Sequence, residues 1–500
     1  MNETRRLKLN ITTSLFLKII TLLSGLILPK IMIGKYGSEM NGLITSITRF
    51  LNIINFLDLG VCAVVESSLY KPLADRDNTL LSKILVSAKK FYKKIAYILI
   101  TYIFLLVLLF PKIDSSVDYI TTTSLILIIS ISMFSQYYIG ISYQIFIGAD
   151  QKYYITNILQ IFTVIVNTIF TIIFVAKGYS IFTVKFVSSI VYIIRPILTY
   201  LYVKKNYNLN LKIKYDKNPI EQRWNGLAQH LAYTVNAQID IILLTLVSNY
   251  TIVSIYSVYS MIVNGVSTLI LSFFNGISPY WGNMIAKKEM KKIEKSFSKS
   301  ELLFHILTTI VYSAMAVLIS PFALVYTKGN YDSLIYYLPL FGILITIATF
   351  CESLRSFYFL IINSAGHYRQ TQKGSFVAMI INIIVSSILV VNFNLNGVVV
   401  GTICSMLYYT LYLVHYLKNN VLNRPIKFFY FHFVIDITSF VIVYIVSRIW
   451  TMAKITAWSW IVYAFKVTIL SILVVLIINF LFYGKQLLSI FKSFFMRKGD

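Results

Sequence analysis

The chain has 500 residues, of which 57% are hydrophobic and 13% charged, and its mean hydropathy is +0.74. Soluble globular domains carry about a quarter charged residues, so this composition excludes an ordinary soluble protein. The formal net charge of +26 would indicate nucleic-acid binding in a soluble chain. The three cysteines (Cys62, Cys351 and Cys404) all lie in apolar runs, and their spacing predicts neither a zinc site nor a disulfide framework.

The chain begins with a short basic segment, Arg5, Arg6 and Lys8, followed by an apolar run that continues to Ile33. This run is longer than the apolar part of a signal peptide and ends without a small-residue cleavage site, so we expect a retained first membrane span. Apolar segments of about 20 residues, long enough to cross a bilayer, recur along the whole chain. About fourteen are predicted, near residues 12–34, 42–66, 94–111, 119–147, 154–176, 180–203, 226–247, 251–283, 303–326, 334–363, 375–393, 396–417, 429–449 and 457–482.

The basic residues alternate between the loops that these spans define. With the N-terminus placed inside, 32 of the 45 Lys and Arg residues lie in inside loops or tails and 6 in outside loops. Cytoplasmic loops carry the excess of Lys and Arg, so both chain ends are predicted to be cytoplasmic. The basic clusters then lie beside anionic lipid headgroups, which argues against a nucleic-acid partner.

The first six spans match the next six at an offset of about 215 residues. Asn167 aligns with Asn382, and the sequence 149–153 aligns with 364–368. Six spans in each half make the halves parallel repeats, a pattern typical of transporters that hold substrate between two lobes. Chance alignment of Ile/Leu/Phe/Tyr-rich segments is the alternative, although long and short loops follow the same order in both halves.

Three segments then resemble a known family: Phe56-Leu57-Asp58-Leu59-Gly60 running to Ser67–Ala74, Gly148-Ala149-Asp150, and Ile277-Ser278-Pro279-Tyr280-Trp281. They resemble the polysaccharide-biosynthesis branch, the Wzx-type O-antigen and capsule flippases, of the multidrug/oligosaccharidyl-lipid/polysaccharide exporter superfamily. The resemblance covers the whole chain, but its motifs are loose. It implies an all-α membrane protein with two pseudo-symmetric six-helix lobes around a central cavity, plus a C-terminal helix pair. The expected parts are an N-lobe (1–205), a cytoplasmic linker (206–224), a C-lobe (225–420), and a final pair with a cytoplasmic tail (421–500).

The resemblance also implies a function and a location: the protein would flip undecaprenyl-diphosphate-linked oligosaccharide units from the cytoplasmic to the outer leaflet of a bacterial inner membrane by alternating access. The expected partners are this lipid-linked oligosaccharide, membrane lipids, H⁺ or Na⁺ as coupling ion, and a polysaccharide polymerase with its chain-length regulator. No enzyme activity and no cofactor are expected. A phosphate-cradling Gly-Lys-Ser/Thr loop is absent from the sequence, and the five His residues are dispersed.

Charged residues inside the spans are the candidate site, since a charge at mid-bilayer costs at least about 2.5–3.5 kcal/mol on insertion scales. An anionic diphosphate would be carried best by Arg, whose planar fork matches phosphate oxygens. Arg49, Arg195, Arg355 and Lys18 are therefore the predicted substrate-binding residues. The structural alternatives are snorkelling of Lys18 to the interface, and a bond from Arg195 to carbonyls freed at a Pro196 kink.

Asp58, Asp240 and Glu352 are the predicted ion-coupling residues, because a buried carboxylate can bind a proton or Na⁺. The alternatives are that Asp58 and Asp240 bond to a Ser, Asn or Tyr of a neighbouring helix, and that Glu352 and Arg355, three residues apart, neutralise each other. Glu66, Lys185, Asp436 and Lys466 are further charges within or near spans.

Two other functions remain open. The first is a cation-coupled multidrug or metabolite antiporter of the same superfamily, which the cationic excess within the spans disfavours. The second is a membrane glycan polymerase or ligase, which would need a large extracytoplasmic loop, whereas the predicted outside loops are short.

Overall fold

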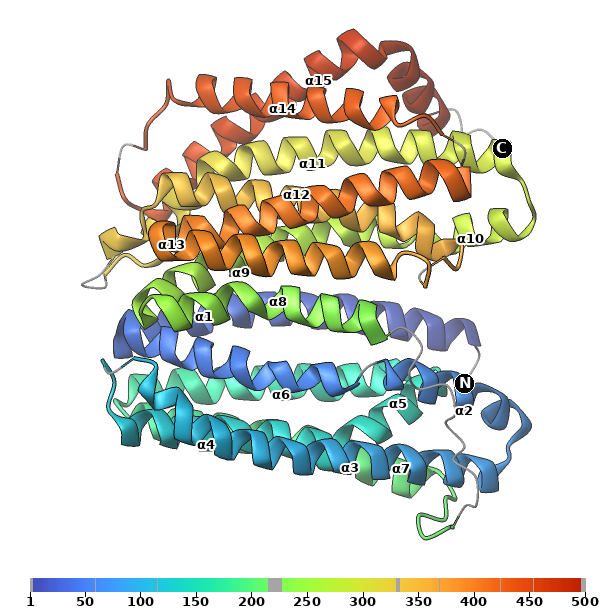
Figure 1. Cartoon of the computed structure of the whole chain (residues 1–500), viewed down its shortest axis with the longest axis vertical. Coiled ribbons are helices and arrows are strands. Elements are labelled where there is room, and N and C mark those ends of the chain that lie inside the picture. The colour runs from blue at the N-terminus through green and yellow to red at the C-terminus, as the bar shows by residue number, and fades with distance from the viewer. Residues whose placement is uncertain are drawn as a thin grey trace. The chain divides into compact units, whose positions relative to one another are not determined.

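A computed structural model describes residues 3–495, apart from residues 59, 115, 215–226, 330–332, 368, 423 and 453. The described chain is all-helical and has no strand (Figure 1). This confirms the predicted all-α class. The helices are α1 (Glu3–Asn52), α2 (Val61–Asp75), α3 (Asn78–Leu109), α4 (Tyr119–Ser135), α5 (Ile141–Ala149), α6 (Tyr153–Ala176), α7 (Ile181–Asn206), α8 (Leu227–Val247), α9 (Tyr250–Asn275), α10 (Ser278–Ala286), α11 (Met290–Tyr326), α12 (Pro339–Ser364), α13 (Gln372–Leu417), α14 (Lys427–Ser447) and α15 (Ala457–Phe495).

The chain divides into two compact units, Met1–Ser254 and Ile255–Asp500, each with its own set of packed helices. The dividing point falls inside α9. The lobe limits expected from the sequence stay a prediction, and the proposed linker at 206–224 lies largely outside the described residues.

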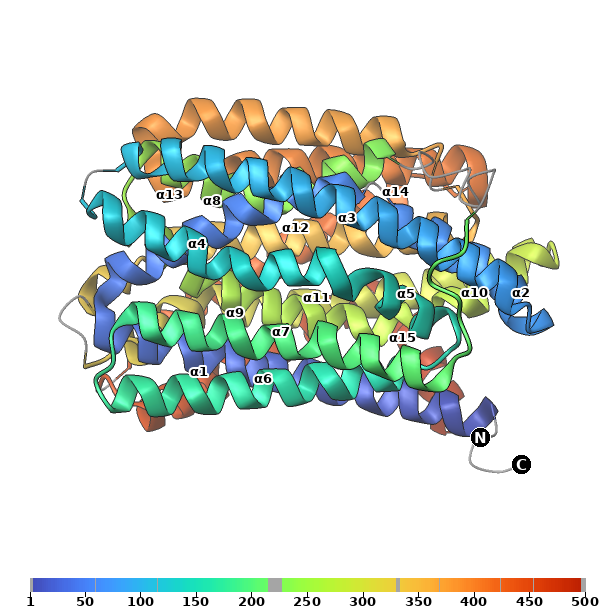
Figure 2. The ribbon, with the colours of Figure 1, turned by 90° about the horizontal axis from the view of Figure 1, so that it is seen from below.

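α1 is a helical hairpin. It has 50 residues, which at 1.5 Å per residue would span about 75 Å, far more than a bilayer. Gly37 breaks it with φ 84° and ψ 168°. Before this break, Asn10 contacts Gln151 at the start of α6, and the Tyr36 hydroxyl donates to Tyr179 beyond its end. After the break, Glu66 on α2 accepts a hydrogen bond from Tyr153, back at the start of α6, so the chain has reversed (Figure 2).

α13 is a second hairpin, with its reversal at Asn394 (φ 46°, ψ −121°). The Ser386 hydroxyl donates to the Val398 carbonyl at 3.1 Å, and Ser405 donates to the Ala378 carbonyl at 2.7 Å. These pairs have nearly constant sums of residue numbers, as two antiparallel halves require. Gly401 allows the close approach, because a Cβ there would lie 2.0 Å from the Ser386 hydroxyl.

Eleven described helical stretches are long and apolar enough to cross a membrane. Two of them contain the hairpins at Gly37 and Asn394, and α8 adds a shorter apolar helix. The chain is therefore a multi-pass membrane protein, whereas the number of fourteen passes stays a prediction.

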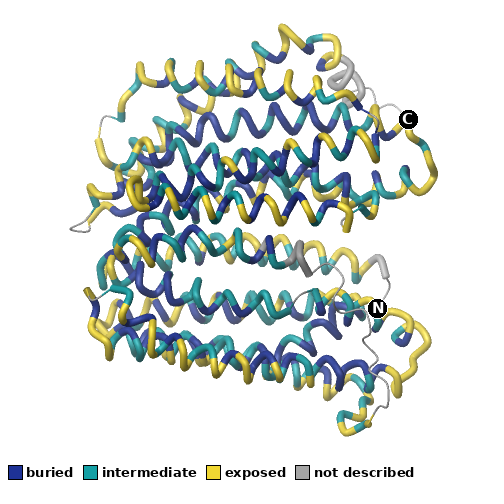
Figure 3. The backbone as a smooth tube through the Cα atoms, viewed as in Figure 1, coloured by how far each residue is buried: buried dark blue, intermediate teal, exposed yellow. Residues whose placement is uncertain are grey.

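Individual helices expose apolar side chains and bury small polar ones, as helices in lipid do. On α6 four of the buried positions are polar (Thr156, Thr163, Asn167 and Thr171), whereas Ile158, Phe162, Ile165 and Ile169 are exposed. Figure 3 shows exposed and buried residues alternating along the helices. Polar contacts between helices add to the packing of small residues, such as the 2.8 Å hydrogen bond between Ser24 on α1 and Thr168 on α6.

α11 is the central helix of the second unit and packs against α10, α12, α14 and α15. The Ser313 hydroxyl on α11 lies 2.7 Å from that of Ser471 on α15, and the Trp460 indole donates to the Leu318 carbonyl. The last two helices are thus held to the second unit mainly through one helix, which also carries its most buried charges.

Candidate functional site

Arg49 and Asp240 occupy the α1–α8 side of the first unit. The Arg49 guanidinium, half-buried on the second half of α1, donates to the Gln238 side chain on α8 at 3.3 Å. Asp240, two residues further along α8, is buried. Lys18 lies on the first half of α1 and is exposed, as the snorkelling alternative expects of a side chain at the bundle surface.

Arg195 on α7 lies beside a wide turn of helix at Gln136–Gly140. Its guanidinium donates to the Gln144 side-chain oxygen Oε1 at 3.1 Å, and the Gln136 and Gln144 side-chain amides bond each other reciprocally at 3.1 and 3.3 Å. The segment Gln136–Gly140 is a short stretch of π-helix, a feature often found at functional sites. Arg195 therefore contacts a neutral amide, and its buried Nε has no hydrogen-bond partner.

Asp58 lies at the end of the 3₁₀ turn Ile53–Asp58, which follows α1. Its carboxylate accepts a hydrogen bond from the Tyr92 hydroxyl on α3 at 2.7 Å. One turn earlier, Asn55 accepts one from Tyr137 at 2.6 Å. The alternative that Asp58 bonds a neighbouring helix's polar side chain is therefore what the structure contains, and the partner is a tyrosine.

Glu352 and Arg355 on α12 form an ion pair at 3.3 Å, as their spacing suggested. The Arg355 side chain is 16% exposed and that of Glu352 is 41% exposed. The Arg355 guanidinium also lies 5.9 Å from the Tyr409 ring centre, and its Nε is buried without a hydrogen-bond partner. These two predicted residues belong to the second unit, whereas the other five belong to the first.

The second unit contains a buried polar network that was not predicted from the sequence, where only its member Asp436 stood out as a charge within a span. It begins at Glu301 on α11, which is 2% exposed. One Glu301 carboxylate oxygen lies 2.5 Å from an Arg424 guanidinium nitrogen, just before α14. The other accepts a 2.6 Å hydrogen bond from the Tyr358 hydroxyl on α12. Arg424 is also held between aromatic rings, 5.3 Å from Phe297 and 4.8 Å from Phe428.

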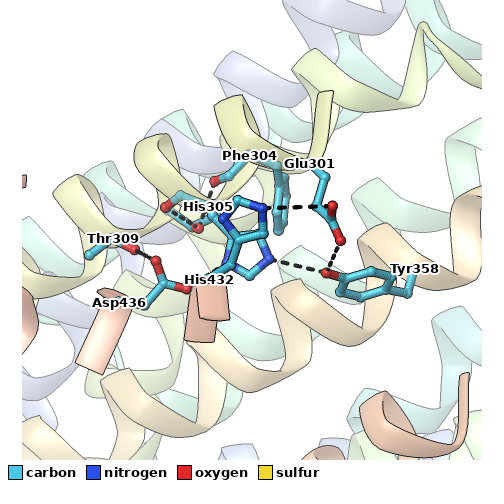
Figure 4. A network of polar contacts seen from close by, with 8 residues as sticks. Glu301, Phe304, His305, Thr309, Tyr358, His432 and Asp436 are labelled. Atoms are coloured by element: carbon cyan, nitrogen blue, oxygen red, sulfur yellow. Dashed lines mark hydrogen bonds and ion pairs between the residues drawn. The ribbon is translucent and has the colours of Figure 1, made fainter. Parts of the chain in front are cut away.

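The network continues through His305, which lies between Tyr358 and Asp436 (Figure 4). His305 Nε2 is 3.1 Å from the Tyr358 hydroxyl, and Nδ1 is 2.5 Å from Asp436 Oδ2 on α14. Asp436 Oδ1 accepts a 2.7 Å hydrogen bond from Thr309. A second imidazole, His432, stacks on His305 with ring centres 4.9 Å apart. Six groups that carry or exchange protons thus meet where three helices cross.

His305 and His432, which are dispersed in the sequence, therefore lie against each other in the structure, although no group of three or more metal-ligating side chains occurs among the described residues. The signal was helical spacing. Glu301, His305 and Thr309 are four residues apart and share one face of α11, as His432 and Asp436 do on α14. Sequence alone could not show that these faces meet, because they lie over 120 residues apart.

No protein-family model and no curated protein sequence matches the chain. Solved structures do match. The lipid II flippase MurJ, in an inward closed conformation, aligns with a TM-score of 0.70 and 16% identity, covering 96% of this chain and 99% of its own. The chain has the fold of MOP-superfamily transporters. An inward-facing multidrug MATE transporter of that superfamily aligns with a TM-score of 0.60 and 10% identity, covering 80% of this chain and 96% of its own.

A third match with the same fold is the Vibrio cholerae MATE transporter VcmN in its bent form, with a TM-score of 0.53 and 14% identity. It covers 82% of this chain and 95% of its own. About a fifth of this chain thus lies outside the alignment with each MATE transporter, whereas nearly all of it aligns with the flippase. The MOP fold agrees with the superfamily that the sequence resembles; the Wzx-type branch is a narrower assignment.

Proposed function

We propose that this chain is a flippase that moves a polyprenyl-diphosphate-linked oligosaccharide, of the O-antigen or capsule type, from the cytoplasmic to the outer leaflet. It would do so by alternating access in a bacterial inner membrane, with both chain ends in the cytoplasm and an H⁺ or Na⁺ gradient as the driving force. A polysaccharide polymerase and its chain-length regulator would use the product.

Arg195 is the observation that carries this proposal. A guanidinium within an apolar helix needs a compensating partner, and in the described residues Arg195 has a neutral amide in place of a carboxylate. A diphosphate offers the oxygen acceptors that a guanidinium binds best. Arg49, which donates to the Gln238 amide oxygen, would be a second cationic group for the diphosphate, and Lys18 a third nearer the membrane surface.

Arg355 differs from Arg195 because Glu352 already neutralises it. Within the proposal, Arg355 would bind the diphosphate only after exchanging Glu352 for the substrate, and the half-exposed Glu352 would be free to take up a cation. Asp58 and Asp240 are the other proposed ion-coupling carboxylates. If they couple an ion gradient, Asp58→Asn or Asp240→Asn will make transport insensitive to that gradient, whereas Tyr92→Phe, which removes only a hydrogen bond to Asp58, will not.

The test is transport by the purified protein in proteoliposomes. The probe is a fluorescent undecaprenyl-diphosphate disaccharide, and the readout is its accessibility to an external reducing agent. Arg195→Ala should lower the initial flipping rate by at least tenfold, and Arg195→Lys by less. Arg448→Ala is the matched control, because Arg448 is an exposed arginine at the end of α14. Equal rates for Arg195→Ala and Arg448→Ala would contradict the proposal.

In cells, deletion of the gene should cause lipid-linked repeat units to accumulate in the inner leaflet. The similarity to multidrug MATE transporters keeps a cation-coupled antiporter as the second candidate. That function predicts instead a loss of resistance to organic cations, with normal lipid-linked intermediates.

A further inference from the structure

Three members of the network on α11, α12 and α14 are more buried than any of the predicted substrate-binding or ion-coupling residues, of which Asp240 is the most buried at 8% exposed. Glu301, His305 and Asp436 are 2%, 1% and 3% exposed, and Arg424 is 8% exposed. Charges this deeply buried destabilise a fold unless they are paired and hydrogen-bonded. The hydrogen bonds and ion pairs among these side chains therefore determine how many protons the network must carry.

The Tyr358 hydroxyl lies between Glu301 and His305, and it has only one proton to donate. Glu301 contacts Arg424 and is a carboxylate, which can only accept, so the single Tyr358 hydroxyl proton is donated to it. The Tyr358 oxygen must then accept from His305, which places a proton on Nε2. At the other ring nitrogen, Nδ1 faces Asp436, whose other oxygen already accepts from Thr309.

A neutral imidazole has one N–H, whereas the contacts of His305 with Tyr358 and with Asp436 each need a proton between the two atoms. With Nε2–H alone, the Nδ1 lone pair would face a carboxylate oxygen at 2.5 Å; with Nδ1–H alone, Nε2 would have no donor toward Tyr358. One additional proton on the His305–Asp436 pair satisfies both contacts. We place this proton on the ring, because an imidazole is a stronger base than a carboxylate in water and the imidazolium would be paired directly with the Asp436 carboxylate.

The net charge of the buried network also indicates one additional proton. Without the additional proton the buried network carries Glu301, Arg424 and Asp436, a net charge of −1; with it the net charge is zero. The charge is assigned to His305 because its ring contacts both Asp436 and Tyr358. His432 instead stacks between His305 and the Tyr483 ring of α15, with ring centres 4.9 and 4.8 Å away, and its Nε2 is 3.8 Å from Glu301. Two stacked imidazolium ions would repel, so the pair of rings accommodates one charge.

We propose that His305 and Asp436 form a binding site for a single exchangeable proton, and that its uptake and release is an ion step of the transport cycle. The first half stands on the geometry alone; the second rests on the proposed transport function. The site is separate from Asp58, Asp240 and Glu352. Its loss of a proton would break a contact that joins α11 to α14, which links the charge of the site to the packing of the terminal helices.

The protonation state of His305 can be measured by ¹⁵N NMR of the detergent-solubilised protein labelled with ¹⁵N-histidine. The protein contains five histidines, so the spectrum has few signals. At neutral pH, one imidazole should have both nitrogens protonated, and His305→Gln should remove that signal. Asp436→Asn should convert it to a neutral ring, whereas His367→Gln, a histidine bonded to Tyr416 outside the network, should leave it unchanged. A neutral His305 in the unaltered protein would overturn the site, and so would an imidazolium that survives Asp436→Asn.

Because the spectrum of the unaltered protein is itself decisive, the proposal stays testable if Asp436→Asn does not fold. The transport step is tested separately, by measuring flipping of the fluorescent disaccharide probe with and without an imposed pH gradient. The ratio of the two rates should be several-fold in the unaltered protein and fall to about one in His305→Gln. A ratio that His305→Gln leaves unchanged would overturn the coupling role. No flipping in any variant would contradict the flippase proposal but not the proton site.

Discussion

Arg424 and Glu301 form an ion pair at 2.5 Å, with both side chains almost completely buried. The pair joins the segment before α14 to α11, the central helix of the second unit. Substitutions in this pair therefore test how much it contributes to the stability of the second unit.

Arg424→Ala should destabilise the second unit by about 3–5 kcal/mol, because it leaves the Glu301 carboxylate buried and uncompensated. The measurement is the thermal unfolding midpoint in detergent, followed by tryptophan fluorescence. The double variant Glu301→Gln/Arg424→Met should recover most of the loss, since it removes both charges together. A double variant that is less stable than Arg424→Ala would contradict this explanation.

Gly401→Ala should destabilise the α13 hairpin, because its new methyl group would lie 2.0 Å from the Ser386 hydroxyl and 2.7 Å from the Ser386 nitrogen. Overpacking of this kind typically costs about 1–3 kcal/mol. Gly25→Ala is the control, since nothing lies within 4 Å of its added carbon. The same unfolding measurement should show a lower midpoint for Gly401→Ala and an equal or higher one for Gly25→Ala.

The two hairpins also predict topology. In a chain whose three cysteines are replaced, Lys35→Cys beside the Gly37 reversal and Phe393→Cys beside Asn394 should react with an impermeant maleimide on intact cells. Lys90→Cys and Lys204→Cys, which are exposed residues of basic inside segments, should react only after permeabilisation. If Lys35→Cys is labelled only from inside, the first hairpin does not cross the membrane and the count of fourteen passes is wrong.

Arg49→Ala and Arg355→Ala, at matched expression, should abolish transport in at least one case. Arg355→Ala additionally leaves Glu352 without its partner, so Glu352→Ala/Arg355→Ala separates a structural role from a substrate-binding one. If the role is structural, the double variant will transport better than Arg355→Ala. Full transport by both single variants would remove these two arginines from the proposed site.

The site could be predicted in part, and the limits differ from residue to residue. The sequence shows that Arg195 and Asp58 lie within apolar runs. Because a charged side chain in a membrane span is energetically costly, both residues stand out as candidates before their partners are known. Their partners, Gln144 and Tyr92, could not be predicted, because an amide or hydroxyl is unremarkable in a helix until the helix it faces is known. The Glu352–Arg355 pair was predictable because both residues lie on one helix at a spacing that fixes their distance.

The all-helical class and the membrane location were determined by the sequence itself. In lipid, backbone N–H and C=O groups have no water to bond to, and a single apolar segment of about 20 residues satisfies them internally by forming an α-helix. Which helix faces meet was decided by the tertiary structure alone. His305 and Asp436 are 131 residues apart and lie 2.5 Å from each other only because α11 and α14 pack side by side. Periodicity places a side chain on a face, whereas the identity of the facing helix depends on the summed packing of the whole unit.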